Sequence, residues 1–227
     1  MKGLSMIECH IKGCMNLDDP FYNSEILSEL TDERKDKILK LKNEPDRKRS
    51  LMAGLMIRDN LKTYGINQED IKVTDNGRPY VSGIDFNVSH SGDYVVMALS
   101  DGKVGCDIEQ VKDRNCSAVN RCFKPSEIKW IEESEDKILA FYRIWTARES
   151  YIKLTGEGIL LDFKSYEVKI KDSLSLPKVE GDITNATPLG VAEVYREGKK
   201  VDCVIAQWLF AENYVISVCG EILGGYS

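Results

Sequence analysis

The sequence has 227 residues, of which 42% are hydrophobic and 30% charged, a composition typical of a folded globular protein and too apolar for a disordered chain. This length allows one large domain or two small ones. The formal net charge of -6 excludes a surface built to hold nucleic acid along its whole length, so any basic site must be local.

Cysteine usage and hydropathy indicate the compartment. The chain has seven cysteines, an odd number, without a Cys-x-x-Cys pair, and only two histidines. This pattern favours reduced thiols over a disulfide framework or a zinc site. No stretch approaches the roughly 20 apolar residues of a membrane span, and the N-terminus lacks the apolar run of a secretory signal. We therefore expect a cytoplasmic protein that does not cross a membrane.

In chain order, the first elements are a strand at 6–15 and two helices. Thr31 is a suitable N-cap for the first helix, because acidic residues occupy the turn that follows it. The second helix is expected at about 46–64, where its apolar residues recur at helical spacing, and Gly65 is its stop signal. We expect both helices to carry basic side chains on their polar faces.

The remaining elements are mostly strands. Residues 78–86 are expected to be extended around Pro79. An apolar run at 94–99 and a second one at 104–108, joined by a turn at Asp101 and Gly102, predict a β-hairpin. Further helices are expected at about 124–133 and 136–155, followed by strands at 166–170, 191–195, 201–209 and 214–219.

The two parts of the sequence resemble each other. Residues 93–96 (Asp-Tyr-Val-Val) are similar to residues 213–216 (Asn-Tyr-Val-Ile), and each part consists of helices followed by an antiparallel sheet. This indicates a duplicated α+β unit. No Pro-, Gly- or Ser-rich linker separates the parts, so we expect them to pack closely, with a ligand site between them.

Two carboxylates in the predicted hairpin are candidates for a metal site. Asp107 and Glu109 are two residues apart in a predicted strand, so both side chains project from the same face. Their mutual repulsion would be relieved by a hard divalent cation, which prefers oxygen ligands. The alternative is a solvated acidic pair at the end of a strand.

A third carboxylate lies on the predicted helix 136–155. Trp145, Glu149 and Lys153 fall on one helical face at spacings of four residues. Taken alone, Glu149 and Lys153 are typical of a surface helix pair worth about 0.2–0.5 kcal/mol. In combination with the two strand carboxylates, Glu149 becomes a candidate metal ligand.

The segment 87–92 gathers small polar residues around His90. Its hydroxyls, imidazole and backbone amides suit phosphate oxygens. An alternative is a serine nucleophile activated by His90, but the sequence has no Gly-x-Ser-x-Gly elbow.

These segments together resemble a known family, the surfactin-synthetase-activating (Sfp) type of 4'-phosphopantetheinyl transferase. The matching blocks, in family order and spacing, are Gly77-Arg78-Pro79, 86–91, 104–109, Phe123 with Glu127, and 145–153 with Gly156 and Gly158. The resemblance implies an α+β fold that is a pseudo-dimer of two similar halves, at 1–105 and 106–227. It also implies that coenzyme A binds between them, with the C-terminal half carrying the metal site and the helix of Glu149 and Lys153.

The resemblance also implies roles for individual residues. It places Mg²⁺, or Mn²⁺ as an alternative, on Asp107, Glu109 and Glu149. It implies contacts to coenzyme A from Arg34 and Lys37 (at the 3'-phosphate), Arg49, Arg78, Ser89, His90 and Lys153. The sequence departs from the family pattern at Arg78 and Arg148, where lysine is commoner. Charge is kept at both positions, although the wider arginine fork could change how a phosphate is held.

The implied reaction moves the phosphopantetheine arm of coenzyme A to a serine of an apo acyl or peptidyl carrier protein and releases 3',5'-ADP. Glu149 or Glu127 would accept the serine proton, directly or through a metal-bound water, and Lys153 would neutralise charge on the leaving phosphate. The alternative for Glu127 is a first-turn helix carboxylate without a catalytic role. We expect a monomer.

The acidic carrier should dock on a locally basic or apolar surface. The residues expected there are Lys124, Ile128, Lys129 and Trp130. Two other functions are open: a non-catalytic module that binds coenzyme A or a carrier, and a magnesium-dependent phosphodiesterase that uses water as nucleophile.

Overall fold

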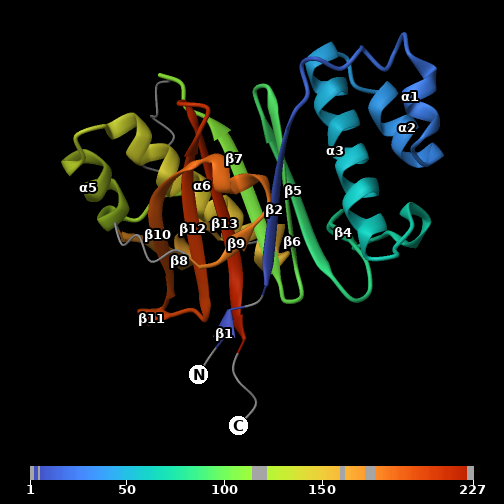
Figure 1. Ribbon diagram of the computed structural model, residues 1–227. Coiled ribbons are helices and arrows are strands. Elements are labelled where there is room, and N and C mark those ends of the chain that lie inside the picture. The colour runs from blue at the N-terminus through green and yellow to red at the C-terminus, as the bar shows by residue number, and fades with distance from the viewer. Residues whose placement is uncertain (1–2, 5, 114–121, 159–161, 172–176, 224–227) are drawn as a thin grey trace.

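The computed structural model describes residues 3–4, 6–113, 122–158, 162–171 and 177–223, and the description below concerns these residues. Two β-sheets pack face to face at the centre of the molecule (Figure 1). Helices α1–α3 lie on the outer side of the N-terminal sheet, and α5 and α6 lie on the outer side of the C-terminal sheet. This α/β/β/α order confirms the predicted α+β class.

The N-terminal helices follow their local signals. They are α1 (Ser24–Ser28), α2 (Asp32–Leu39) and α3 (Glu44–Thr63). The side chain of Thr31 caps α2 by accepting a hydrogen bond from the Arg34 amide at 3.4 Å, as predicted. The apolar face of α3 packs on the N-terminal sheet, where it forms a core with Phe86 and Met97.

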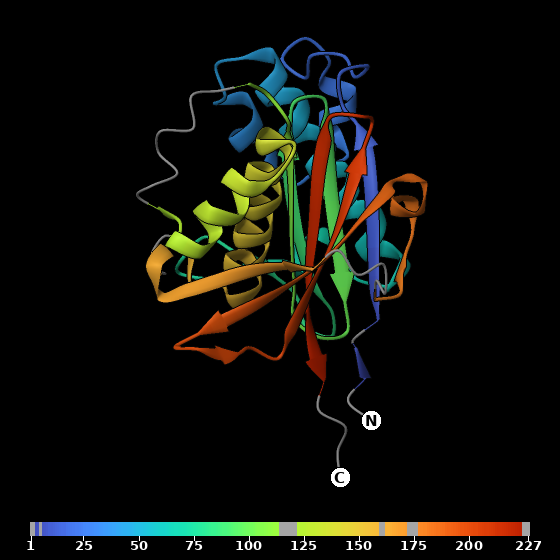
Figure 2. The ribbon, with the colours of Figure 1, turned by 90° about the vertical axis from the view of Figure 1, so that its left-hand side faces the viewer.

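The N-terminal sheet has the strand order β5-β6-β2-β9. Its strands are β2 (Ile7–Gly13), β5 (Asp85–Ser91), β6 (Tyr94–Ser100) and β9 (Val179–Glu180). β9 comes from the C-terminal part of the chain and pairs in parallel with β2 at the sheet edge (Figure 2). A separate ribbon pairs β3 (Lys72–Val73) with β4 (Pro79–Tyr80).

The C-terminal sheet has the order β1-β13-β12-β10-β11, with β7 pairing to β13 and β8 to β10. Helices α5 (Pro125–Glu133) and α6 (Lys137–Thr155) complete this part. The strands are β1 (Gly3–Leu4), β7 (Val104–Gln110), β8 (Tyr166–Lys171), β10 (Thr187–Arg196), β11 (Lys199–Lys200), β12 (Cys203–Phe210) and β13 (Tyr214–Leu223). Short 3-10 turns occur at Gln68–Asp70, Phe163–Ser165 and Asp182–Asn185.

The predicted hairpin between β6 and β7 is wrong. Both edges of β6 are occupied, by β5 and β2, so β7 has no place beside it. The turn at Asp101 and Gly102 instead carries the chain into the other sheet, where β7 pairs with β13. β6 and β7 therefore meet face to face, with Ala98 of β6 and Cys106 of β7 in the shared core.

The predicted duplication is visible in the order and pairing of elements. β2, α3, β5 and β6 are matched by β7, α6, β12 and β13: β2 pairs with β6 as β7 pairs with β13, and α3 and α6 cover equivalent faces. The rings of Tyr94 and Tyr214, from the two similar sequences, meet edge to face at 4.9 Å. The division into 1–105 and 106–227 stays a prediction, and its boundary lies inside β7.

Two sequence expectations concern the whole chain. In the described part, no helix is long and apolar enough to cross a membrane. The described cysteines, at 9, 14, 106, 122, 203 and 219, are free thiols, and Cys116 lies outside the described residues.

Candidate active site between the two halves

The site begins with an unusually close approach of α6 to β7. A Cβ atom added to Gly105 would lie closer than 3.0 Å to the Ser150 carbonyl oxygen and the Leu154 amide nitrogen. Only glycine leaves room for the helix backbone at this point of the strand. The approach brings Lys153, near the end of α6, beside Asp107 of β7.

Lys153 joins the two halves through a compact cluster of polar atoms. Its Nζ donates to the Asp107 Oδ1 at 2.7 Å and to the Ser89 Oγ of β5 at 2.8 Å. The Ser89 hydroxyl in turn donates to the same Asp107 oxygen at 2.8 Å. Burial is the largest single effect and would lower the pKa of Lys153, but Asp107, Cys106 and Glu149 together outweigh it, and the net pKa shift is upward. Lys153 is therefore an ammonium ion at neutral pH.

The predicted carboxylates lie close to one another at this cluster. The Asp107 Oδ2 is buried without a hydrogen-bond partner in the described part of the chain. Glu109 accepts a hydrogen bond from the Ser91 hydroxyl at 2.7 Å. Burial, and then the negative charges of Asp107 and Glu109, raise the pKa of Glu149. The sequence prediction that these three carboxylates share one region is consistent with this electrostatic coupling.

The donor chemistry at this region fits a hard divalent cation. Among the described residues the buried Asp107 Oδ2 is an acceptor without a hydrogen-bond partner, and the pKa of Glu149 is raised by burial and by the charge of Asp107, so a cation would be favourable for both carboxylates. In the structure, the Lys153 ammonium supplies the positive charge next to Asp107. Across the described ranges, no three His, Cys, Asp or Glu side chains are gathered closely enough to hold a metal ion.

Alternate side chains of β5 hold the seam between the sheets, a feature that the sequence analysis missed. Asp85 accepts from the Val104 amide at 2.9 Å, and Asn87 accepts from the Cys106 amide at 3.0 Å. Ser91 accepts from the amide of Gln110 at 3.1 Å. At this edge of β7, side chains of β5 therefore accept the backbone hydrogen bonds that a neighbouring strand would otherwise accept. The available signal was the period-two run of Asp, Asn, Ser and Ser at 85, 87, 89 and 91.

The basic side of the site includes His90 and Arg49. Arg49 of α3 donates to the Gly92 carbonyl at 2.8 Å and pairs with Asp46. Desolvation, and then the charge of Arg49, lower the pKa of His90, with a further contribution from Lys153. The imidazole is therefore neutral at physiological pH and lies between two cationic side chains.

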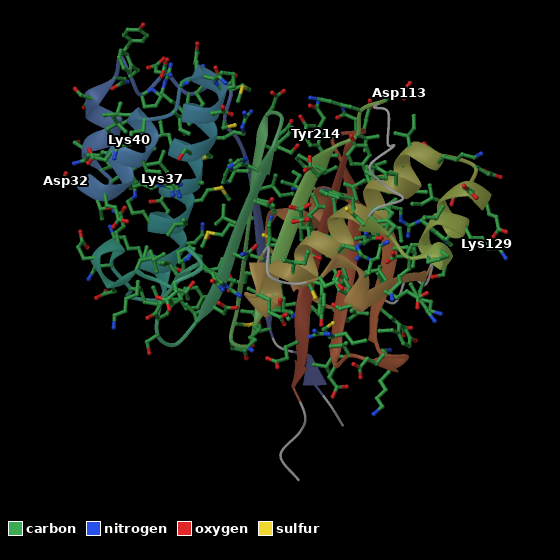
Figure 3. The ribbon with its side chains drawn as sticks, turned by 180° about the vertical axis from the view of Figure 1, so that it is seen from behind. Asp32, Lys37, Lys40, Asp113, Lys129 and Tyr214 are labelled. Atoms are coloured by element: carbon green, nitrogen blue, oxygen red, sulfur yellow. The ribbon has the colours of Figure 1, made fainter. Side chains whose placement is uncertain are left out.

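Arg34 and Lys37 line a pocket of about 410 Å³ on the N-terminal half. The other lining residues come from α2, α3 and the segment 68–79. Arg34 donates through Nη2 to the Ser50 carbonyl at 2.8 Å, while its buried Nε has no hydrogen-bond partner in the described residues. Lys37 lies on α2, and its side chain is exposed (Figure 3). The pocket lining therefore contains two cations, Arg34 and Lys37, together with two carboxylates, Glu33 and Glu69.

Arg78 is engaged with protein groups. Its guanidinium pairs with Asp85 at 2.7 Å and donates to the carbonyls of Lys153, Leu154 and Val104. Two of these carbonyls, those of Lys153 and Leu154, belong to the last turn of α6. The predicted contact of Arg78 with coenzyme A stays a prediction.

Glu127 requires a correction. Its side chain and that of Arg148 are both fully buried and form an ion pair with N–O distances of 2.6 and 2.8 Å. Glu127 also accepts from the amides of Lys124 and Val168, and the Arg148 guanidinium lies over the Tyr166 ring. A carboxylate saturated in this way has no access to a substrate. This burial favours the non-catalytic alternative for Glu127, and it pairs the Arg148 guanidinium with a carboxylate of the protein.

The residues expected to dock a carrier lie on α5. Lys129 is exposed and projects from the side of the molecule opposite Lys37 (Figure 3). Ile128 and Trp130 are only partly buried against the C-terminal core, and Arg143 lies over the Trp130 ring. No contact in the structure tests this docking surface.

Comparisons with known proteins agree with the two-part α+β fold. Residues 103–219 match the model of the 4'-phosphopantetheinyl transferase superfamily, and residues 22–101 match that of the "4'-phosphopantetheinyl transferase, N-terminal" family. A 4'-phosphopantetheinyl transferase of Bacillus subtilis is 27% identical over 202 residues, 86% of this chain and 83% of the relative. The transferase gsp of Aneurinibacillus migulanus is 28% identical over 198 residues, 85% of this chain and 76% of the relative.

A third relative is Sfp of Bacillus subtilis strain 168, which is 26% identical over 167 residues, 68% of this chain and 75% of the relative. The fold and site define a duplicated α+β protein in which carboxylate, hydroxyl and ammonium groups from both halves meet between the two sheets. The chain belongs to the 4'-phosphopantetheinyl transferase superfamily and is a transferase enzyme, which confirms the resemblance drawn from its motifs.

Proposed function

We propose that this enzyme transfers the 4'-phosphopantetheine arm of coenzyme A to a serine of an apo acyl or peptidyl carrier protein. The observation that carries the proposal is the cluster of Lys153, Ser89 and Asp107, which is assembled from both halves in the manner that the family motifs require. Family membership supports coenzyme A as the phosphopantetheine donor.

The basic residues suggest how coenzyme A lies in the cleft. Arg34 and Lys37 line the pocket that we assign to the 3'-phosphate, which their positive charges would attract. Ser89, His90 and Lys153 are our candidates for contacts to the pyrophosphate. Arg49, near His90, adds positive charge to that stretch of the cleft.

Asp107, Glu109 and Glu149 are the residues that would hold a magnesium ion, with manganese as an alternative. When bound, the ion would neutralise charge on the pyrophosphate and polarise the phosphorus under attack. The assignment is supported by the Asp107 Oδ2, which has no hydrogen-bond partner among the described residues. Without the ion, the ammonium of Lys153 balances the negative charge of Asp107.

In the reaction, the carrier serine Oγ forms a bond to the β-phosphorus of coenzyme A, and the bond from that phosphorus to the bridging oxygen breaks. The serine hydroxyl loses its proton to a nearby base, for which Glu149 is the candidate because Glu127 is buried in its ion pair. The leaving 3',5'-ADP gains negative charge on its phosphate. The Lys153 ammonium is placed to stabilise that charge in the transition state.

Further parts of the proposal concern the setting of the reaction. The two halves of one chain supply all candidate residues, which supports a monomeric enzyme. The free thiols of the described cysteines support a reducing compartment, in line with the cytoplasm. For the carrier, we propose docking on α5 and its neighbours, where Lys129 is exposed.

The test is intact mass spectrometry of purified apo-carriers after incubation with the enzyme, coenzyme A and magnesium. A phosphodiesterase would release 3',5'-ADP from coenzyme A without any carrier, and a binding module would release none. We expect release of 3',5'-ADP only when a carrier is present, in equal amount to the modified carrier.

A further inference from the structure

Arg78 reaches the last turn of the helix that carries Lys153. Its Nη1 donates to the Lys153 carbonyl at 2.7 Å and to the Leu154 carbonyl at 3.2 Å. The final carbonyls of a helix have no partner within the helix, because the chain leaves the axis beyond them. Here Gly156, in the left-handed conformation, ends α6. Arg78 supplies the donors that the end of α6 otherwise lacks.

The opposite side of the same guanidinium is anchored to both sheets. Nη2 pairs with Asp85 of β5 at 2.7 and 3.0 Å and donates to the Val104 carbonyl of β7 at 3.1 Å. Asp85 also accepts from the Val104 amide. One planar group thus connects the end of α6 to the two strands that carry Ser89 and Asp107. Those are the two partners of the Lys153 ammonium.

We propose that Arg78 is a positioning residue that fixes the Lys153 ammonium against Ser89 and Asp107 by clamping the end of α6 to β5 and β7. The forked, planar guanidinium suits this task, because it can donate in several directions from a fixed geometry. The clamp turns Arg78 toward α6, out of the lining of the pocket that its neighbours Gly77 and Pro79 help to form and into the lining of a second pocket of about 320 Å³ beside Lys103 and Gly156.

The kinetic test of Arg78 rests on the proposed transfer reaction. It distinguishes a positioning role of Arg78 from a direct contact with a phosphate of coenzyme A. We expect R78M to lower kcat by roughly 10-fold or more with the KM for coenzyme A changed less than about 3-fold, since a misplaced Lys153 affects mainly the transition state. A rise in the KM for coenzyme A with an unchanged kcat would assign Arg78 to ligand binding and overturn the proposal.

A double-mutant cycle with K153M tests whether Arg78 acts through Lys153. If it does, adding R78M to K153M should lower kcat by less than about 2-fold, because the group being positioned is already absent. Independent, multiplicative losses would contradict the proposal. R196M is the matched control: Arg196 lies near the same helix end, but its partners in the described part of the chain are side chains, a 3.5 Å pair with exposed Glu157 and a hydrogen bond with Tyr151. We expect R196M to keep wild-type kcat.

Hydrogen exchange supplies a readout that does not depend on activity. In the free enzyme, R78M should speed exchange at the Gly156 amide, which bonds the Ile152 carbonyl, and at the neighbouring amides of the last turn, by roughly 10-fold or more, while the centre of α6 is unchanged. Unchanged exchange at the last turn would overturn the proposed clamp. This result does not depend on whether the enzyme modifies a carrier protein.

R78K is the second variant, should R78M fail to fold. Its ammonium can reach the helix carbonyls but cannot bridge them to Asp85 and Val104 at once. We expect R78K to fold, to show faster exchange in the last turn than wild type, and to lose less kcat than R78M would. An R78K enzyme with wild-type exchange and a raised KM for coenzyme A would contradict the proposal.

Discussion

Lys153 on α6 donates a 2.8 Å hydrogen bond to Ser89 on β5, although the two residues belong to different halves of the duplicated fold. Both residues also bind the same oxygen of Asp107. The contact exists only when the halves are packed together, so the site depends on the seam between the sheets. Residues that maintain this seam are therefore expected to affect catalysis without touching the substrate.

Replacing Lys153 with methionine tests its catalytic role. Methionine keeps an apolar stem of similar length but removes the ammonium, so the fold and coenzyme A binding should largely survive. We expect kcat to fall by roughly 100-fold or more, the scale of losing a preorganised charge-stabilising group. Steady-state kinetics across a magnesium series checks this. K129M, which removes an exposed lysine on α5, is the control for the KM of coenzyme A.

If K153M kept near-normal turnover, Lys153 would be only the counter-ion of Asp107. Glu149→Gln should behave differently from K153M. Loss of one carboxylate charge should weaken the binding of the magnesium ion, so raising the magnesium concentration should partly restore activity. The two variants therefore separate charge stabilisation from cation binding.

The buried pair of Glu127 and Arg148 is expected to serve stability. Glu127→Gln removes the carboxylate that pairs with the buried Arg148 guanidinium, and breaking such a pair costs about 3–5 kcal/mol in the free energy of unfolding. Urea denaturation measures this loss. Glu133→Gln, on the same helix, disrupts only the exposed pair with Lys129 at 3.7 Å and should cost less than about 1 kcal/mol.

The folded fraction of Glu127→Gln should keep a kcat within a few-fold of wild type. A large loss of kcat with unchanged stability would instead restore the catalytic role that the sequence suggested for Glu127.

Local signals predicted the elements well, whereas partners distant in sequence could not be predicted. Thr31 and Gly156 mark helix ends through their own side chain or backbone conformation, so the sequence around them is sufficient. The partner of β7 is β13, more than 100 residues away, and a hairpin with β6 was the simpler local solution. The apolar pattern of β7 is compatible with either sheet.

The candidate site shows the same division. Spacing along β7 and α6 made Asp107, Glu149 and Lys153 candidates only in combination, and the family resemblance supplied their predicted roles. The burial of Glu127 depends on Arg148, 21 residues away, and on the amide of Val168, so its motif position could not reveal it. The clamp by Arg78 was also missed, because its acceptors are mostly backbone carbonyls, which carry no residue-specific signal.

Gly105 is expected to be essential for the approach of α6 to β7. Gly105→Ala places a methyl group against the backbone of Ser150 and Leu154, which cannot move aside as a flexible side chain would. We expect a loss of stability of about 1–3 kcal/mol and a reduced kcat as Lys153 moves from Asp107. Thermal unfolding and kinetics measure both. Gly13→Ala, with ordinary contacts to Tyr94, should change neither by much; equal effects would contradict the close-packing argument.

Arg34 and Lys37 are expected to recognise the 3'-phosphate. Replacing both with alanine should raise the KM for coenzyme A by roughly 10-fold or more and change the KM for 3'-dephospho-coenzyme A much less. Kinetics with the two donors provides the comparison, because only one of them carries the phosphate. Equal effects on both donors would indicate that these residues only form a solvated helix face.

The Asp19–Arg47 pair is expected to make stability depend on pH. The hydrogen bonds from Arg47 lower the pKa of Asp19 from 3.8 to about 2. Because the folded-state pKa is the lower one, this stabilisation is complete above about pH 4 and is lost as the pH falls toward 2. The difference in unfolding free energy between wild type and Asp19→Asn should shrink over that range.

The most direct test of the central claim is the intact mass of an apo-carrier protein incubated with coenzyme A, magnesium and this enzyme. We predict that the carrier gains the mass of one phosphopantetheine on its acceptor serine, that 3',5'-ADP appears in equal amount, and that K153M and Asp107→Ala strongly slow both. Unmodified carriers throughout a panel of fatty-acid, polyketide and peptide types, with a folded enzyme that binds coenzyme A, would contradict the proposed transfer.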